Sequence, residues 1–348
     1  MKICFVGHAF HKRTGSSQFI QSILRELGEV TVLSSSPDED RMSDDTVVLE
    51  YLNNQYDLWV FHQTEYIAAR LIPLGLRNAV IAPMYDGAWA RPDDFFRQFV
   101  NCRFLSYSRA LHTRLQRLDQ RSASFEFWPE PAPLVERSPE RDDWNAFFWE
   151  RRPLLMPNAR SVAQQCRALG IGHLHVHAAP DFPEEAVSAH GYRHRDNLAG
   201  VAISTSTWFE TGDEFRAVSG NPLFHFTPRL YEGIGMAMLE AMARGQVVVA
   251  PDRPTANEYI GHLSSGILYD PERPLDLPEL NPSEVAEMGA AARQRVVCGH
   301  QTWLEDRERL VSFLLDDGRR WPTTDASAHF GLSIRRAARE RRVKAMRK

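Results

Sequence analysis

Two hydrophobic patterns alternate along this chain. Short apolar runs, typical of buried parallel strands, are separated by segments with apolar residues three and four positions apart, typical of amphipathic helices. The first run covers residues 2–7, a helical pattern over 19–27 ends at Gly28, and a second run covers 30–33. The alternation continues along most of the chain and predicts an α/β fold with parallel sheets. Further strands are expected at residues 57–62, 79–83, 104–108, 144–150, 173–177, 201–209, 223–226 and 246–250.

A proline-rich stretch divides this pattern. Pro129, Pro131, Pro133 and Pro139 alternate with charged residues, as in a linker between domains. The length of 348 residues is enough for two domains. We expect a Rossmann-like domain over residues 1–135, a second over 136–316, and a C-terminal extension over 317–348 that returns toward the first domain.

The most informative stretch is a strand, loop, helix and strand over residues 222–269. Its loop contains Glu232, Gly233, Ile234 and Gly235, and a helical pattern follows directly. The N-terminus of a helix favours anions and sugar oxygens, and glycine lets a ligand approach the main chain. Glu240 lies eight positions after Glu232, which is about 80° past two full turns of a helix. Two carboxylates so placed suit hydrogen bonds to vicinal hydroxyls.

This stretch resembles the retaining glycosyltransferases of the GT-B fold, family 4. Glu232 and Glu240 match the E-x7-E motif of that family, and residues 227–250 match the turn, loop, helix and strand around it. Residues 257–260, 265–268 and 301–303 resemble its later landmarks. The resemblance implies two Rossmann-like domains that face each other across a cleft. It also implies a nucleotide-diphosphate sugar as donor, which is a co-substrate, and no cofactor or metal.

The resemblance assigns roles in the C-terminal domain. Glu240 would hold the ribose, Glu232 would contact sugar hydroxyls, and the N–H groups of Gly233, Ile234 and Gly235 would face the sugar. Arg151 matches the arginine that balances the leaving diphosphate. The family's glycine before it is Glu150 here and its lysine is Met156, so Arg152 or Arg160 is a candidate second cation. Trp208 and Phe209 lie where the family places the nucleotide base.

In the N-terminal domain, Gly15 and Ser16 match the loop that lies under the donor diphosphate. The family's histidine after the strand at residues 79–83 is replaced by Tyr85 and Asp86. Asp86 is a candidate to accept the proton of the acceptor hydroxyl, or is a structural turn residue. We interpret His62 as a hydrogen-bonding residue at the end of a strand, with a catalytic base as the alternative.

Two patterns suggest metal sites without supporting context. Residues 38–40 match the D-x-D motif of another glycosyltransferase fold, but they lie in a polar loop. His173, His175 and His177 share one face of a predicted strand, and no carboxylate or cysteine partner is obvious. We therefore expect neither to bind a metal.

Charge and cysteine usage bear on location. The formal net charge is −4, yet residues 335–348 hold eight Lys or Arg and one Glu. This tail is suited to an anionic membrane surface, with a solvated end as the alternative. No nucleic-acid motif accompanies it. Four scattered cysteines, no run of eighteen apolar residues and no signal peptide predict a cytoplasmic protein, peripheral at most on the inner face of the membrane. The family resemblance adds the expectation of a bacterial protein.

The sequence thus predicts a hexosyltransferase-type glycosyltransferase (EC 2.4) of polysaccharide biosynthesis. A saccharide, a lipid-linked sugar or a small molecule would be its hydroxyl acceptor. Two alternatives stay open. One is a catalytically inactive sugar-nucleotide-binding or scaffold protein, and the other is a nucleotide-sugar epimerase or hydrolase of the same fold.

Overall fold

The computed structural model describes residues 1–8, 11, 14–35, 41–138, 140–152, 157–180 and 197–316, with the backbone alone at 41–44. The chain forms two compact units. Met1–Phe125, together with the chain from Glu305 onward, makes the first unit, and Glu126–Leu304 makes the second. The first unit ends earlier than the expected residue 135, and the last described helix belongs to it rather than to the second domain.

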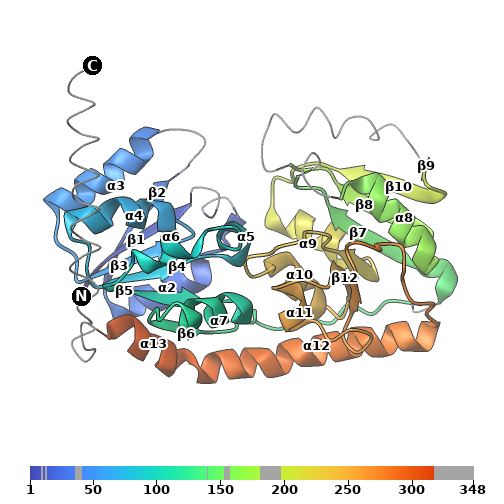
Figure 1. Cartoon of the computed structure of the whole chain (residues 1–348). Helices are drawn as coiled ribbons and strands as arrows, with labels where there is room; N and C mark the ends of the chain where they lie inside the picture. The colour runs from blue at the N-terminus through green and yellow to red at the C-terminus, as the bar shows by residue number, and fades with distance from the viewer. Residues whose placement is uncertain are drawn as a thin grey trace, which may run out of the picture. The chain divides into compact units, whose positions relative to one another are not determined.

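A parallel sheet is the centre of the first unit (Figure 1). Its strands run in the order β2 (Glu29–Ser35), β1 (Lys2–His8), β3 (Leu58–His62), β4 (Ala79–Ala82), β5 (Cys102–Ser106) and β6 (Ser122–Ser124). The helices of this unit are α2 (Gln18–Leu27), α3 (Arg41–Asn53), α4 (Glu65–Leu71), α5 (Tyr85–Ala88), α6 (Asp93–Arg97), α7 (Arg109–Arg117) and α13 (Arg307–Leu315).

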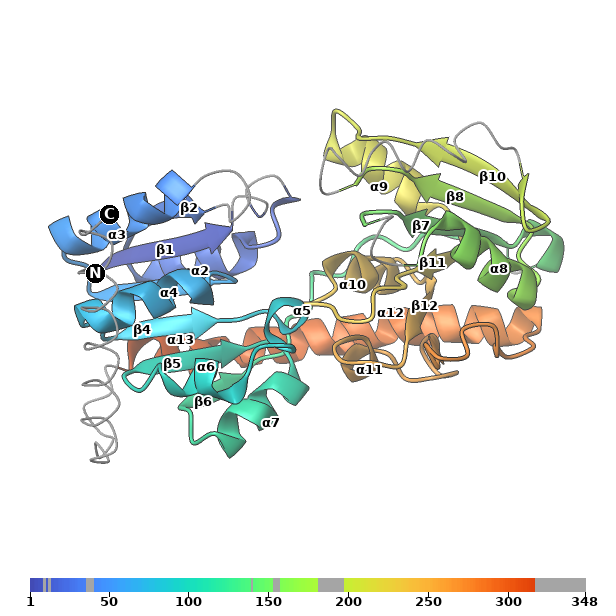
Figure 2. The same cartoon turned by 45° about the horizontal axis from the view of Figure 1, so that its top comes forward.

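Alternating side chains of this sheet face two helical layers. Cys4, Val6 and Phe61 pack in one core with residues of α3, α4 and α7. Figure 2 shows α3 and α4 on one side of the sheet and α2 on the other. Helix α13 also belongs to this unit, since the Arg103 guanidinium donates to the carbonyl of Leu314 over 3.1 Å.

The second unit contains a seven-stranded sheet. Its order is β13 (Ile267–Tyr269), β12 (Val247–Pro251), β11 (Phe224–Phe226), β7 (Asn145–Trp149), β8 (His173–His177), β10 (Val201–Ser206) and β9 (Asn197–Leu198), with only β9 antiparallel to its neighbour. The helices are α8 (Ala159–Leu169), α9 (Gly212–Gly220), α10 (Met236–Ala243), α11 (Ala256–Tyr259) and α12 (Pro282–Glu305). Short 3-10 turns lie at Ile72–Leu74 in the first unit and Arg141–Asp143 in the second.

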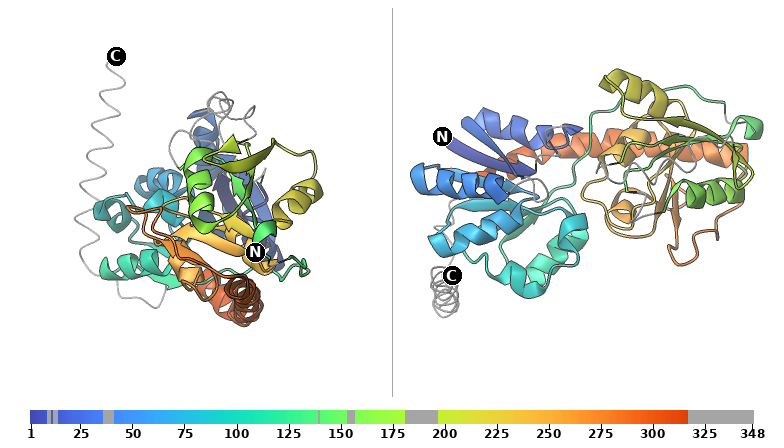
Figure 3. Two further views of the ribbon diagram at one scale, coloured as in Figure 1. Left: turned by 90° about the vertical axis from the view of Figure 1, so that its right-hand side faces the viewer. Right: turned by 90° about the horizontal axis from the view of Figure 1, so that it is seen from above.

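Helices cover both faces of this second sheet. Ala146, Phe148 and Val176 pack with α8 and the start of α12, while α9 lies on the opposite side (Figure 3). When the antiparallel β9 is left out, the strands follow the doubly wound order 3-2-1-4-5-6, whose switch point lies between the first and the fourth strand. Those strands are β7 and β11, so a ligand site is expected beyond their carboxyl ends.

Most predicted elements are present with shifted ends. Strand β10, for example, stops at Ser206 instead of 209. Helix α3 was not predicted, and residues 38–40 lie outside the described part of the chain. Two helix ends have local caps. Gly245 follows α10 with a φ of +75°, and Asn281 Oδ1 accepts the N–H of Glu284 over 3.0 Å at the start of α12.

The C-terminal end of α10 is held from several directions. Arg293 donates to the carbonyl of Ala243 over 2.5 Å, and Arg137 donates to that of Arg244 over 2.8 Å. Cations at these carbonyls satisfy acceptors that a helix end leaves open. Helix α12 passes so close that a Cβ on Gly289 would lie 2.5 Å from the carbonyl oxygen of Gly245. These contacts fix α10 and, through it, the loop that precedes it.

We predict that Gly289→Ala destabilises the protein by about 1–3 kcal/mol, because a backbone oxygen cannot move aside as a flexible side chain can. Urea unfolding followed by circular dichroism measures this. Gly172→Ala is the matched control, since a Cβ there meets no atom within 4 Å. Equal midpoints for the two variants would show that α12 does not pack this closely on the α10 turn.

Candidate functional site

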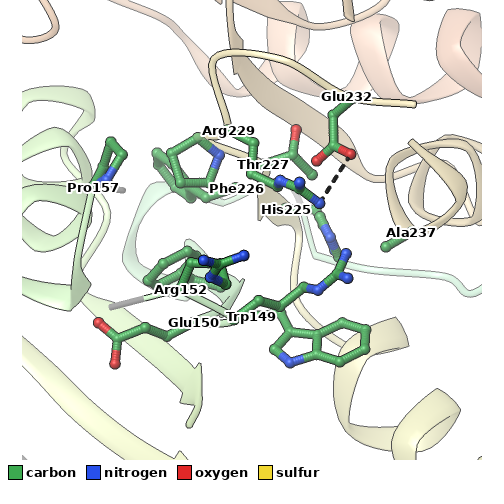
Figure 4. Close-up of a pocket in the computed structure, with 13 residues that line it drawn as sticks. Trp149, Glu150, Arg152, Pro157, His225, Phe226, Thr227, Arg229, Glu232 and Ala237 are labelled. Atoms are coloured by element: carbon green, nitrogen blue, oxygen red, sulfur yellow. Dashed lines mark ion pairs between the residues drawn. The ribbon is translucent and has the colours of Figure 1, made fainter. Parts of the chain in front are cut away.

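A pocket lies at the carboxyl ends of β7 and β11, where the sheet order predicts a ligand site. Residues 148–152 and Pro157 line one side, residues 225–229 another, and Glu232 and Ala237 complete it (Figure 4). We call this the β7–β11 pocket. It brings together three predicted site residues, Arg151, Arg152 and Glu232, from segments about eighty positions apart in the chain. All its lining residues belong to the second unit.

The loop before α10 forms one edge of the pocket. Gly235 is the N-cap of α10 and has a φ of +77°, a left-handed conformation that favours glycine. The buried Thr255 hydroxyl donates to the carbonyls of Glu232 and Gly233 and so holds the loop from behind. Within residues 197–316, the N–H groups of Gly233, Ile234 and Gly235 donate no hydrogen bond. Their contact with a donor sugar stays a prediction, because the pocket lining itself includes only Glu232 and Ala237 from this segment.

Glu232 faces an arginine across the pocket mouth. Its Oε2 lies 3.4 Å from Nη1 of Arg229, and the two side chains are 13% and 18% exposed (Figure 4). A pair this shielded from water is screened less than a surface ion pair. Arg229 therefore orients the Glu232 carboxylate. Sequence reasoning placed Arg229 in a turn and gave it no role, although its i,i+3 spacing to Glu232 was a signal.

Glu240 lies on α10 outside the pocket lining. It pairs with Arg244, whose Nη2 is 3.6 Å from its Oε2, and its side chain is 41% exposed. Desolvation raises the pKa of Glu240, and the positive charges of Arg244 and Arg216 oppose that shift. Because water still reaches two fifths of the side chain, its carboxylate can meet a ligand.

The segment after β7 supplies cations and a buried acid. The Arg151 guanidinium lies over the ring of Trp149, 5.2 Å from its centroid. Glu150 is 1% exposed, and its Oε1 accepts the N–H of Ala159, the first residue of α8, over 2.8 Å. Sequence reasoning missed this contact, because position 150 differs from the glycine of the resembled family and local spacing does not link it to Ala159. Met156, the expected lysine position, lies outside the described residues.

His225 and Thr227 are further pocket residues that sequence reasoning missed. Among the described residues, His225 Nδ1 and Thr227 Oγ1 are buried atoms without a hydrogen-bond partner. Desolvation, assisted by the charge of Arg244, lowers the pKa of His225 to about 3, so its ring is neutral. Two neutral polar groups so placed can bind the hydroxyl or ester oxygens of a ligand.

A layer of histidine and aromatic rings covers the same sheet face beside the pocket. Phe209 stacks on His177 with centroids 5.1 Å apart, and His177 also contacts Trp149, a pocket residue. His175 bonds to the hydroxyls of Ser204 and Ser206, each over 2.8 Å. The pocket lining does not include Phe209, so its place under a nucleotide base stays a prediction.

The remaining predicted residues belong to the first unit. Gly15 has a φ of +70° in the loop after β1, and the Ser16 hydroxyl lies 2.6 Å from Nδ1 of His11. This loop lies at the switch point of its own sheet, between β1 and β3. Asp86 Oδ1 accepts the N–H of Gly87 over 2.9 Å. These contacts leave the roles proposed for Gly15, Ser16 and Asp86 as predictions.

The interpretation of His62 as a hydrogen-bonding residue is wrong. Its ring is 0% exposed, and within the described residues neither ring nitrogen has a hydrogen-bond partner. It packs instead against other rings, with His11 at 4.9 Å and Phe5 at 5.7 Å between centroids. Desolvation, assisted by His11, lowers the pKa of His62 well below its ordinary value. A ring so enclosed packs as an apolar group, because His62 ends strand β3 against the rings of Phe5 and His11 and does not reach the surface.

The described residues also bear on metal-ion sites and on membrane-spanning helices. In the described ranges, no group of three or more His, Cys, Asp or Glu side chains is arranged to hold a metal ion. No helix of that same part of the chain is long and apolar enough to cross a membrane. The basic tail at residues 335–348 lies outside the described part, so its membrane contact stays a prediction.

Comparison with known proteins agrees with this geometry. Residues 223–280, which hold the loop, α10 and β12, match the family model described as Glycosyl transferases group 1. No curated protein matches the chain. The family match and the fold together support a glycosyltransferase with the GT-B fold.

Solved structures share the fold at low sequence identity. Sucrose-phosphate synthase from Thermosynechococcus elongatus has a TM-score of 0.64 at 13% identity, over 90% of this chain and 100% of that one. Anabaena HepE with UDP and glucose has a TM-score of 0.59 at 15% identity, over 89% and 100%. The lipopolysaccharide outer core galactosyltransferase WaaB scores 0.63 at 13%, over 90% and 99%. All three confirm two Rossmann-like units with parallel sheets.

The histidine layer generates a prediction for acid stability. Burial lowers the pKa of both His175 and His177 to about 4. As the pH falls below about 6.5, these histidines bind protons in the unfolded chain but not in the folded unit. The free energy of unfolding therefore decreases until the pH reaches the pKa of the folded-state histidines. Each histidine can cost up to about 2 kcal/mol at pH 5.

Urea unfolding at pH 7 and at pH 5 measures this loss. His177→Phe keeps a ring against Phe209 and removes the proton site, so we expect the variant to lose less stability than the wild type between the two pH values. A variant with the wild-type pH dependence would show that His177 is not held neutral.

Proposed function

We propose that this protein is a retaining, metal-independent glycosyltransferase that transfers a hexosyl group from a nucleotide-diphosphate sugar to a hydroxyl. A saccharide, a lipid-linked sugar or a small molecule would carry that hydroxyl. One observation supports this most strongly. The β7–β11 pocket combines arginines after β7 with an oriented glutamate, and the main-chain N–H groups that follow Glu232 at the start of α10 donate no hydrogen bond within residues 197–316.

The start of α10 suits the donor sugar. The N–H groups of Gly233, Ile234 and Gly235 would donate to sugar oxygens with the helix dipole behind them. Glu232, held by Arg229 at 3.4 Å, would accept hydrogen bonds from sugar hydroxyls. Because this ion pair engages the carboxylate, we assign Glu232 to hydroxyl binding and not to attack on the anomeric carbon. Retention would then proceed by attack on the face that the leaving group departs from, through an oxocarbenium-like state.

The cations after β7 suit the diphosphate. Breaking the bond between the anomeric carbon and the phosphate oxygen leaves an additional negative charge on the diphosphate. Arg151 and Arg152 line the pocket where they could balance that charge, and guanidinium groups bind phosphate with two parallel hydrogen bonds. Such preorganised charge stabilises the transition state without reorganisation of water.

The nucleoside and the acceptor complete the proposal. Glu240, partly exposed on α10, would hold the ribose hydroxyls, and Phe209 would lie near the base. Gly15 and Ser16 would support the diphosphate from the first unit, and Asp86 would accept the proton of the acceptor hydroxyl. The HepE structure contains UDP and glucose, which supports a nucleotide-sugar donor here.

Calorimetry with UDP, GDP and ADP tests the donor class, followed by a turnover assay with sugar donors of the base that binds best. We expect one nucleotide diphosphate to bind well above the others, and transfer to an acceptor from its sugar conjugate. Binding without turnover across a broad acceptor panel would favour the inactive sugar-nucleotide-binding protein. Donor consumption without any acceptor would favour the epimerase or hydrolase.

The two glutamates separate binding from turnover. We expect Glu240→Ala to weaken nucleotide binding about tenfold, because lost hydrogen bonds to ribose cost about 1–2 kcal/mol. Glu232→Gln is expected to lower kcat more than nucleotide affinity, because its partners are on the sugar. Glu287→Ala, an exposed residue of α12, is the control. Wild-type behaviour of both site variants would contradict this assignment.

A further inference from the structure

A buried carboxylate inside the β7–β11 pocket occupies a helix terminus. Glu150 lines the pocket and is 1% exposed, and its Oε1 accepts the N–H of Ala159 over 2.8 Å. Asn158 Oδ1 accepts the N–H of Ser161, the third residue of α8, over 3.2 Å. In Figure 4 the Glu150 carboxylate points away from Glu232. The start of α8 therefore already contains its own anion.

This position has consequences for a charged ligand. The N-terminus of a helix attracts anions, and a phosphate would otherwise compete for those N–H groups. Glu150 takes the place of that phosphate and adds a fixed negative charge to the pocket wall. The pocket lining holds three arginines and two glutamates. Glu232 pairs with Arg229, and Glu150 directly precedes Arg151 and Arg152 in the chain.

The pocket is built for a ligand independently of this helix. His225 lines it, is 2% exposed and has a buried Nδ1 without a partner among the described residues. A polar atom so enclosed costs free energy unless something binds to it. A ligand that hydrogen-bonds to His225 Nδ1 would lie in a pocket whose lining includes both Arg151 and Arg152 and the carboxylate of Glu150.

We infer that Glu150 determines specificity by charge: it repels ligand anions in proportion to their charge, so the pocket selects phosphate esters of low charge over triphosphates. The inference rests on the proposed function in that it assumes an anionic ligand in this pocket. The donor's diphosphate is esterified at both ends and carries less charge than a nucleoside triphosphate. Glu150 would thus keep free triphosphates from occupying the donor site.

Glu150→Gln tests this directly. The amide oxygen can still accept the N–H of Ala159, so size and cap are retained while the charge is removed. We would titrate wild type and variant with inorganic orthophosphate, pyrophosphate and tripolyphosphate by calorimetry at low salt. Removal of one fixed charge is expected to raise affinity by about threefold per ligand charge, so the gain grows along the series. It should shrink at high salt.

Asn158→Asp provides a second variant with the opposite sign. It keeps the cap oxygen and adds a charge at the same helix start, so affinity is expected to fall, and most for tripolyphosphate. This variant keeps the test informative if Glu150→Gln does not fold, which thermal unfolding would show.

The outcomes separate the two proposals. If both proteins bind the series and the gain is equal for all three anions, the effect is structural and the inference about Glu150 fails alone. If the variants change nothing, Glu150 exerts no charge effect and the inference also fails. If none of the proteins binds any of the anions, the pocket is not a phosphate site, and the proposed function fails with it.

Discussion

The position of the loop before α10 depends on one set of main-chain contacts. Thr255 donates to the carbonyls of Glu232 and Gly233, and arginines from two other segments bind the carbonyls at the far end of the helix. The carbonyl groups are thereby hydrogen-bonded at both ends of the segment formed by the loop and α10. The N–H groups of Gly233, Ile234 and Gly235 at its start donate no hydrogen bond within residues 197–316. A helix of eight residues would be marginal in isolation. Here the surrounding contacts hold α10 and its preceding loop in one conformation. The N–H donors of the loop would therefore not need to rearrange when a ligand binds.

The sequence predicted those features that depend on neighbours along the chain. The alternating strands and helices and the glycine-containing loop before α10 follow from such local rules. The sheet order, which places the pocket between β7 and β11, came only from the structure. The stretch around Glu232 could be interpreted because its glycines, carboxylates and helix start lie within a few turns of each other. The family match over residues 223–280 covers the same region.

Features that depend on folding could not be predicted in this way. Glu150 caps a helix nine residues later, and only the bend after β7 brings its carboxylate to the N–H of Ala159. Helix α3 was missed because Val47, Val48, Leu49 and Leu52 do not mark one clear face. His62 was assigned a hydrogen bond because it ends a strand, yet the loop after β1 and the ring of Phe5 enclose it. In each case the contacts were determined by tertiary packing, which the spacing of residues along the sequence does not reveal.

The layer of His175, His177 and His225 has a consequence for the electric field in the pocket. These rings provide hydrogen-bonding atoms under the site without adding charge, because burial keeps all three neutral. The charges in the pocket lining are therefore those of its arginine and glutamate side chains and not of His225. Mild acidification would therefore leave these three rings uncharged beside the pocket, even as it lowers the free energy of unfolding of the second unit.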